Sequence, residues 1–243
     1  MRKQYWQNKP LLFIVGILSL GIYSCKKEHV AIAVITNASE APLPCPDSIR
    51  DIDENRYRVI DAFGQCWLKE NLHVAHYQNG DSIQEVLDNA QWAAQNQGAF
   101  SKYENNNVND SIYGKLYNGF AIADPRNVCP TGWHVSSEND WNKLLDSLGG
   151  ANIAAASLKA LELWSLPNTG ATNEIGFSAL PGGTRDADHG GFFSSLTNTG
   201  YWWEATPQNV PGGAVRYMNY PNVNVNRFSF LKKNGFSLRC VRD

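Results

Sequence analysis

The sequence predicts an α+β fold of short twisted antiparallel strands, two short helices and long loops. Its apolar runs are short and are separated by Asn, Pro and Gly, which is the pattern of strands joined by turns. Helical patterns are few, and the clearest covers residues 137–148. The chain has 8 tryptophans and 20 glycines in 243 residues, so we expect aromatic side chains to supply much of the core of a loop-rich fold.

Residues 1–24 have the pattern of a secretory signal. Arg2 and Lys3 precede an apolar run over residues 11–20, which is too short for the roughly 20 residues of a membrane-spanning helix. A small residue then precedes Cys25, as in the lipobox of bacterial lipoproteins. This resemblance implies that Cys25 carries acyl chains, which would anchor the protein firmly to a membrane. The alternative is ordinary secretion, with no role for Cys25.

The next stretch, residues 25–55, predicts a flexible tether. It is rich in Ala, Ser, Thr and Asn and contains Pro42, Pro44 and Pro46, so it buries little and should be extended or disordered. Residues 56–243 then form one domain. The net charge of −2 and the lack of a basic stripe exclude nucleic acid as an expected partner.

Four cysteines remain in the mature chain beyond Cys25. An even number of cysteines in an exported protein predicts disulfides, and four cysteines allow three pairings. We favour Cys129–Cys240, which would tie the middle of the domain to its last strand, and Cys45–Cys66, which would fix the tether to an early strand. A zinc site is the weaker interpretation because no two cysteines have the C-x-x-C spacing.

The first half of the domain is expected to contain mostly strands and loops. Residues 57–60 and 65–68 read as two strands joined by a turn. Further along we expect a short helix or irregular lobe over 80–97, a polar loop over 103–110, and a strand that starts at 113–118 and continues into 120–123.

The clearest helix begins at Ser137. Asp140, three residues later, completes the pattern of a capping box. Apolar side chains then fall on one helical face at positions 141, 144, 145 and 148, and Gly149–Gly150 ends the helix. A second short helix is expected over 153–161, with Leu158 and Leu161 facing the core.

The last part of the chain alternates loops and strands. We expect a polar loop over 169–176, a strand over 177–180, and a strand pair that leads from Phe192–Phe193 into 200–203. The terminal stretch, residues 200–243, is rich in Tyr, Asn, Trp and Ser, which suit a rigid yet adaptable binding surface. Because Trp202 and Trp203 alternate, one of the two rings could face outward and stack on a sugar.

Five motifs in this order resemble the Fibrobacter succinogenes major paralogous domain family, from about residue 57 to 243. They are QCWLKENL, YGKLYNGFAIADPRNVCPTGWHVSSENDWNKLLDSLGG, NTGATNEIGFSALPGGTRD, GYWWEAT and GFSLRCVRD. Members are typically exported or lipid-anchored bacterial surface proteins, and their biochemical activity is largely undefined. The resemblance implies a C-type-lectin-like fold, as in formylglycine-generating-enzyme-type domains and in variable proteins of diversity-generating retroelements. Glu204 departs from the Ser that the family often has, and Gly119–Phe120 departs from its aromatic residues.

No catalytic residue is assigned. His134 and His189 read as bracing or turn residues, and the sequence has no nucleophile elbow, phosphate loop or H-E-x-x-H motif. Asp186 and Asp188 lie in a glycine-bounded loop, and Glu174 lies in the oxygen-rich loop 168–174. These carboxylates are weak candidates for a Ca²⁺ site, but a solvated turn is the favoured interpretation, so we expect no cofactor.

The expected function is a non-catalytic binding module of the cell envelope, on the outer membrane or cell surface. Its ligand would be an extracellular glycan or protein, and its contacts would be Glu204, Arg216, Tyr217, Asn219, Tyr220, Asn222, Asn224, Asn226, Arg227 and Phe228. A further hypothesis is that a retroelement diversifies this stretch, since Asn and Tyr are outcomes of adenine-directed mutagenesis. The alternatives are an adhesion scaffold without a small ligand and an envelope enzyme related to formylglycine-generating-type domains.

Overall fold

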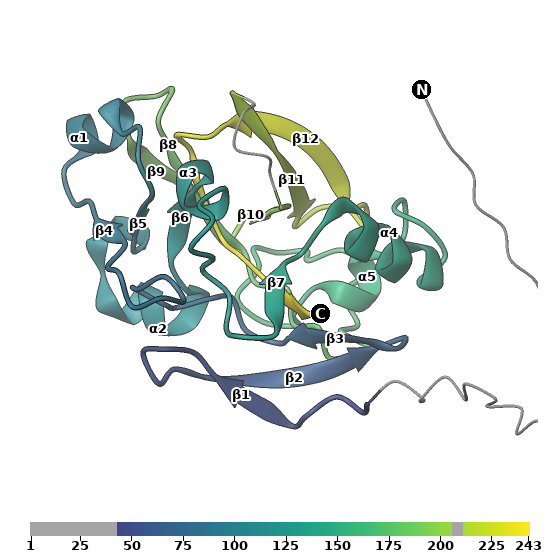
Figure 1. The fold of residues 1–243 in the computed structure, drawn as a ribbon. Coiled ribbons are helices and arrows are strands. Elements are labelled where there is room, and N and C mark those ends of the chain that lie inside the picture. Colours follow the sequence, from purple (N-terminus) through teal and green to yellow (C-terminus); the bar gives the residue numbers. More distant parts are fainter. Residues whose placement is uncertain (1–42, 206–210) are drawn as a thin grey trace, which may run out of the picture. The chain divides into compact units, whose positions relative to one another are not determined.

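Both ends of the folded unit meet in one five-stranded sheet of the computed structural model, which describes residues 43–205 and 211–243 (Figure 1). The order of this antiparallel sheet is β1 (Ser48–Arg50), β2 (Arg56–Ala62), β3 (Gln65–Leu68), β14 (Cys240–Arg242) and β7 (Trp133–Val135). The strands expected over 57–60 and 65–68 are therefore confirmed.

The expected start of the fold at residue 56 was wrong. Strand β1 pairs with β2 through Ser48–Arg58, Ile49–Tyr57 and Arg50–Arg56. The folded unit begins at Leu43, because this pairing and the disulfide at Cys45 include residues assigned to the tether. Residues 25–42 of the expected tether, the signal segment and Cys25 lie outside the described residues.

Two further sheets contain the remaining strands. The six-stranded sheet has the order β4 (Gln84–Glu85), β5 (Ala99–Ser101), β6 (Leu116–Asn118), β13 (Gly235–Phe236), β8 (Gly182–Asp186) and β9 (Phe192–Leu196). The three-stranded sheet has the order β10 (Thr199–Trp203), β11 (Gly212–Asn219) and β12 (Asn226–Leu231). Only β4 and β5 are parallel among the strand pairs of the described chain, which is thus α+β with mostly antiparallel strands.

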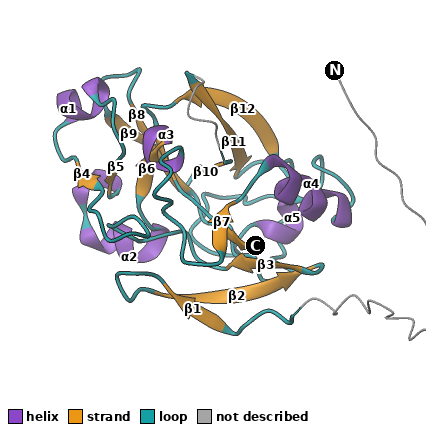
Figure 2. Cartoon of the chain, in the orientation of Figure 1, coloured by secondary structure: helices purple, strands orange, loops and turns teal. Residues whose placement is uncertain are grey.

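More helices form than the two expected from the sequence (Figure 2). They are α1 (Asn89–Ala94), the 3-10 helix η1 (Tyr103–Asn105), α2 (Asn107–Tyr113), α3 (Gly119–Ile122), α4 (Glu138–Ser147) and α5 (Ala155–Leu158). None of these helices has the length and apolar character required to cross a bilayer. The polar loop expected over 103–110 is wrong, because Asn106 accepts a hydrogen bond from Val108 N and caps α2.

Helix α4 forms as the sequence predicts. Ser137 and Asp140 make the capping box, and Trp141, Leu144 and Leu145 are buried. Helix α5 is shorter than the expected 153–161.

Three other local expectations were wrong. The side chain of Leu161 is 64% exposed and does not face the core. The strand expected over 177–180 is reduced to a single bridge between Ala179 and Lys159. After β6 the chain does not continue as a strand, because Asn118 caps α3 by accepting a hydrogen bond from Ala121 N.

Strand β10 is packed on both faces. The Trp202 ring lies 6.3 Å from that of Trp141 on α4, while the Trp203 ring lies 5.0 Å from that of Phe236 on β13. Both tryptophans are fully buried, so neither ring is available for sugar stacking, contrary to the expectation for this pair. Alternation along a strand places the two side chains on opposite faces of the sheet, as predicted. Here each of these faces packs against its own hydrophobic cluster.

Candidate functional site

A cleft lies between the β8–β9 hairpin and the three-stranded sheet. Its volume is about 290 Å³, and it combines the glycine-bounded acidic loop with the terminal stretch singled out from the sequence. Its walls are formed by Thr184, Asp186, Asp188, His189, Ser194, Ser195, Tyr201, Phe230, Asn234 and Phe236. Two larger cavities, of about 520 and 480 Å³, are lined by other parts of the fold.

One wall of the cleft is aromatic. The centroid of the Tyr201 ring lies 5.7 Å from that of Tyr217, 6.1 Å from that of Phe230 and 5.0 Å from that of Phe236. The strand register explains this grouping, because Tyr201 on β10 is directly opposite Tyr217 on β11. The row continues to Phe228, whose ring centroid is 5.2 Å from that of Phe230 and whose side chain is 61% exposed. An aromatic surface therefore runs from the core to solvent.

The opposite side of the cleft is a turn rich in hydrogen-bonding groups. Asp186 accepts a hydrogen bond from Asp188 N at 3.0 Å, and its other oxygen lies 2.6 Å from His189 Nδ1. This hydrogen bond raises the pKa of the exposed His189. Asn234 accepts a hydrogen bond from Ala187 N at 2.8 Å and ties the turn to the end of β12. The acidic loop is thus held in place beside the aromatic wall.

The Tyr201 hydroxyl interacts with Thr199 and Ser195 and feels the charge of Asp186. Burial raises its pKa, and hydrogen bonding with Thr199 and Ser195 only partly opposes this effect, while the negative charge of Asp186 adds to it. Tyr201 is therefore neutral at physiological pH and offers both a hydroxyl and an apolar ring to a ligand in the cleft.

Two of the contacts expected from the sequence belong to the interior. Glu204 is 1% exposed, and its carboxylate accepts hydrogen bonds from Arg216 Nε at 2.5 Å and Arg227 Nη2 at 2.9 Å. Arg216 is also buried and donates to Asn142 on α4 at 2.8 Å. The expectation that Glu204 and Arg216 touch a ligand is therefore wrong, since they join the three-stranded sheet to α4.

Several other expected contacts surround a buried lysine. Lys159 Nζ shares its three N–H donors among four carbonyl oxygens, which lie 3.0 Å away at Thr169 and Asn222, 3.3 Å at Tyr220 and 3.5 Å at Asn219. An ammonium group thus connects the oxygen-rich loop 168–174 to the end of β11. Glu174, a Ca²⁺ candidate in the sequence, accepts a hydrogen bond from Ser157 Oγ at 3.2 Å. No group of three or more His, Cys, Asp or Glu side chains that could hold a metal is found in residues 43–205 and 211–243.

None of the ten ligand contacts expected from the sequence lines the cleft itself, although the aromatic surface beside it includes two of them. Tyr217 and Phe228 belong to this aromatic surface, and Asn226 lies on the same face of the sheet, opposite Tyr217. The half-buried Asn224 lies in the loop before β12 and does not line the cleft. The sequence-based prediction did not include Tyr201 and Phe230. Both lie two positions along a strand from a predicted residue, Trp203 and Phe228 respectively, and therefore on the same face.

A family model described as the Fibrobacter succinogenes major domain matches residues 60–242. The chain belongs to the Fibrobacter succinogenes major domain family. This confirms the resemblance seen in the sequence, and every residue that lines the cleft lies inside the matched range. The comparison with curated proteins found no match, and neither did the comparison with solved structures.

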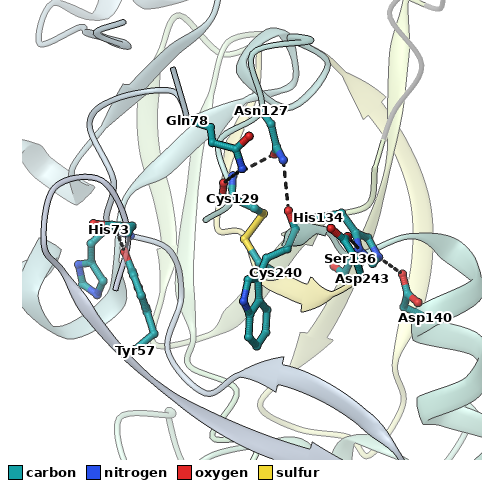
Figure 3. Close-up of a disulfide and its surroundings, with 12 residues drawn as sticks. Tyr57, His73, Gln78, Asn127, Cys129, His134, Ser136, Asp140, Cys240 and Asp243 are labelled. Atoms are coloured by element: carbon teal, nitrogen blue, oxygen red, sulfur yellow. Dashed lines mark hydrogen bonds and ion pairs between the residues drawn. A yellow bond between two sulfur atoms is a disulfide. The ribbon is translucent and has the colours of Figure 1, made fainter. Parts of the chain in front are cut away.

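The disulfides of the chain pair as the sequence predicts. Cys129 is bonded to Cys240 (Figure 3). Cys45 is bonded to Cys66, so none of these four residues has a free thiol. The first bond links the turn before β7 to the last strand, and Asn127 accepts a hydrogen bond from Cys129 N at 3.0 Å.

His134, on β7, lies between two carboxylates beside this disulfide (Figure 3). Its Nδ1 is 2.7 Å from Asp243 Oδ1 and its Nε2 is 3.0 Å from Asp140 Oδ2. Ser137 donates to the same Asp140 oxygen at 2.5 Å, so the serine hydroxyl is bound to a carboxylate and not to the imidazole. This arrangement connects β7, α4 and the chain end, and it differs from the serine–histidine contact that activates a nucleophile.

Proposed function

We propose that this chain is a lipid-anchored binding module of the cell envelope and that its cleft holds an extracellular glycan. The observation that carries the proposal is the pairing of an aromatic wall with a fixed turn of carboxylate, imidazole and amide groups. Binding sites are commonly concave and largely apolar, with a few well-placed polar groups. The exposed ring of Phe228 extends the wall beyond the cleft.

The chemistry of the two sides suits a saccharide. The C–H face of a sugar ring packs on an aromatic ring such as that of Tyr201, while sugar hydroxyls donate to carboxylates and accept from amides and hydroxyls. Asp188 is exposed, lines the cleft, and makes no side-chain hydrogen bond within the described chain, so its carboxylate is available to a ligand. The proposal requires no cofactor, and Ca²⁺ bound with the ligand is the alternative.

The proposed anchor is Cys25, at the end of a lipoprotein-type signal. Mass spectrometry of the membrane-extracted protein tests it directly. We expect acyl chains on the N-terminal peptide that begins at Cys25, and expect a Cys25→Ser variant to be released from the membrane. An unmodified mature N-terminus would contradict lipid anchoring while leaving the cleft proposal open to its own test.

We also propose that the α+β domain has a C-type-lectin-like fold. Support comes from its antiparallel strands, from helices α4 and α5 in the C-terminal half, and from the position of β14 between β3 and β7. A crystal structure superposed on lectin-like domains would test this, and a different strand connectivity would contradict it.

An array of glycans and envelope proteins, probed with the purified chain, tests the proposed function. We expect selective glycan binding that falls when Phe228 is replaced by alanine, because its exposed ring would lose stacking contacts. Replacing the exposed Leu161, which lies outside the cleft lining, by alanine is the matched control and should leave binding unchanged. Binding to proteins alone would contradict the glycan assignment, and loss of glycan binding in chelator would indicate Ca²⁺.

A further inference from the structure

Strand β12 is the open edge of the three-stranded sheet. The sheet order is β10-β11-β12, so within the described residues β12 pairs with β11 and with no other strand (Figure 1). Four of its six residues are exposed, namely Arg227, Phe228, Ser229 and Leu231. Natural proteins usually protect such an edge with a proline, a bulge or lysines, because it can pair with another chain. Strand β12 contains no proline or lysine, and its register with β11 is continuous.

The backbone hydrogen bonds of β10 show which way the backbone groups of β11 point. Trp203 lies opposite Val215 but donates its N–H to Ser237 O at 3.1 Å. The next residue, Glu204, donates its N–H to Ala214 O at 2.9 Å. In an antiparallel pair such bonds alternate from one residue to the next. Val215 therefore directs its backbone N–H and C=O away from β10 and towards β12.

The same alternation identifies the free backbone groups of β12. Phe228 lies opposite Val215, so it directs its N–H and C=O towards β11. Arg227, Ser229 and Leu231 therefore direct theirs to the open side of the sheet. The carbonyl oxygen of Leu231 also accepts a hydrogen bond from the turn after β12 at 3.1 Å, and it has a second lone pair. These groups form a template for one more antiparallel strand.

The residues of β12 are self-complementary in an antiparallel pairing. If Ser229 lies opposite Ser229 of a second copy, Arg227 lies opposite Leu231 of that copy, and all three residues with outward backbone groups are used. Phe228 then lies opposite Phe230, and aromatic pairs that face each other across two strands are favourable. The strand therefore fits a second copy of itself.

No like charges lie opposite each other in this register. Arg227, the one charged residue of β12, would face an apolar residue, and its guanidinium is already bound to Glu204 and Glu138, each at 2.9 Å. Two lysines follow the strand. Lys232 is buried, and Lys233, beyond the paired residues, donates to a carbonyl oxygen of α1 at 3.3 Å. The charges near this edge are thus compatible with the pairing.

We propose that this protein forms a two-fold symmetric dimer through β12, in which the two three-stranded sheets join into one antiparallel sheet. The interface is isologous, because the same strand of each copy contributes to it. One strand from each copy buries a small area, so the dimer is reversible.

The dimer has a consequence for the cleft. Its symmetry axis passes through the Ser229 pair, perpendicular to the joined sheet, so the aromatic faces of both copies lie on one side. Tyr201 and Phe230 line the cleft and belong to that face. Two clefts on one side can hold two units of a single repeating ligand, with an avidity that neither provides alone. This consequence rests on the proposed function, whereas the dimer does not.

Sedimentation equilibrium of the full chain across a concentration series tests the proposal. We expect a reversible equilibrium between monomer and dimer. Ser229→Lys should abolish the dimer, because the two substituted side chains meet at the symmetry axis as like charges. Ser229→Glu should abolish it for the same reason, whereas an equimolar mixture of the two variants should form a heterodimer.

Ser194→Lys is the matched control. Ser194 is an exposed serine in the middle of β9, an edge strand of the six-stranded sheet, and this variant should dimerise as the wild type does. Since both serines are exposed, the melting temperatures of all variants should stay close to that of the wild type. The proposal is overturned if the chain is monomeric at every concentration, if Ser229→Lys dimerises as the wild type does, or if the mixture of Ser229→Lys and Ser229→Glu gives no heterodimer.

Discussion

Glu204, Arg216 and Arg227 form a charged group whose members differ in exposure. The side chains of Glu204 and Arg216 are 1% and 6% exposed, whereas that of Arg227 is 41% exposed. A buried carboxylate is stable only when its partners replace the water it has lost. Because both arginines donate to Glu204, this residue stabilises the junction between β10, β11 and β12.

Replacing Glu204 by alanine should therefore destabilise the fold. We expect a loss of about 3–5 kcal/mol in unfolding free energy, since Arg216 would be left as a buried, uncompensated charge. Glu138, an exposed partner of Arg227 at 2.9 Å, is the matched control, and its replacement by alanine should cost less than about 1 kcal/mol. Urea unfolding followed by circular dichroism measures both, and equal losses for the two variants would contradict this role.

At the residue scale, the sequence predicted residue types better than their exposure. It marked Glu204, Arg216 and the Trp202–Trp203 pair as informative, but it could not show that helix α4 covers one face of β10 and Phe236 the other. The exposure of a side chain depends on which elements pack on its face of the sheet. Those elements are distant in the sequence, so a local pattern does not reveal them. The disulfide pairing was predictable because four cysteines allow few combinations.

Helix α4 begins at a junction of three elements that is sensitive to pH. Hydrogen bonding to Asp140 raises the pKa of His134, although burial opposes it and Asp243 adds to it. Burial alone would raise the pKa of Asp140, but hydrogen bonds from His134 and Ser137 outweigh this effect and lower it to about 2. The charged pair therefore joins the start of α4 to β7.

The stabilising effect of this pair should be confined to a window of pH. Protonated His134 stabilises the fold fully below its unfolded pKa of 6.5, and this contribution is lost as pH rises through its higher folded value. Ionised Asp140 contributes above its unfolded pKa of 3.8, and this contribution is lost as pH falls towards about 2. The pair should therefore be most effective between these two unfolded values.

A His134→Gln variant tests this window. We expect the difference in unfolding free energy from the wild type to be largest between pH 3.8 and 6.5, at about 1 kcal/mol because His134 is half-exposed. Denaturation series across pH measure the difference. A difference that stays constant from pH 4 to pH 9 would show that charge on His134 has no role.

Elements with a clear local pattern were predictable, and those held by tertiary contacts were not. Helix α4 has both its cap and its apolar face in the sequence. Helix α2, by contrast, is polar, and it forms between the buried side chains of Tyr103 and Tyr113. The packing of those two tyrosines decides the conformation of the chain between them. A prediction from local propensity alone therefore assigned a loop to this segment.

At the scale of the whole molecule, the last strands hold distant segments together. Strand β14 lies between β3 and β7, and β13 lies between β6 and β8. Such long-range pairing cannot be read from periodicity, because periodicity identifies strands but not their neighbours. The cleft was not predictable for the same reason, since Asp186 and Phe230 belong to different sheets.

The two disulfides should contribute unequally to stability. Cys129–Cys240 spans 111 residues and Cys45–Cys66 spans 21. In the chain-entropy description, the longer loop contributes about 4–5 kcal/mol and the shorter about 3 kcal/mol. We expect the Cys129→Ala/Cys240→Ala double variant to melt below the Cys45→Ala/Cys66→Ala variant in calorimetry. The reverse order would show that local packing outweighs loop closure.

The central claim is that the cleft binds a ligand, and a titration of the best array glycan into two charge-matched variants tests it most directly. Asp188 lines the cleft, whereas Asp146 is exposed on α4 and does not line it. We expect Asp188→Ala to weaken binding about fivefold or more, as for a lost hydrogen bond to a charged group, with an unchanged melting temperature. Asp146→Ala should bind as the wild type does. Equal affinity of both variants would contradict binding at the cleft.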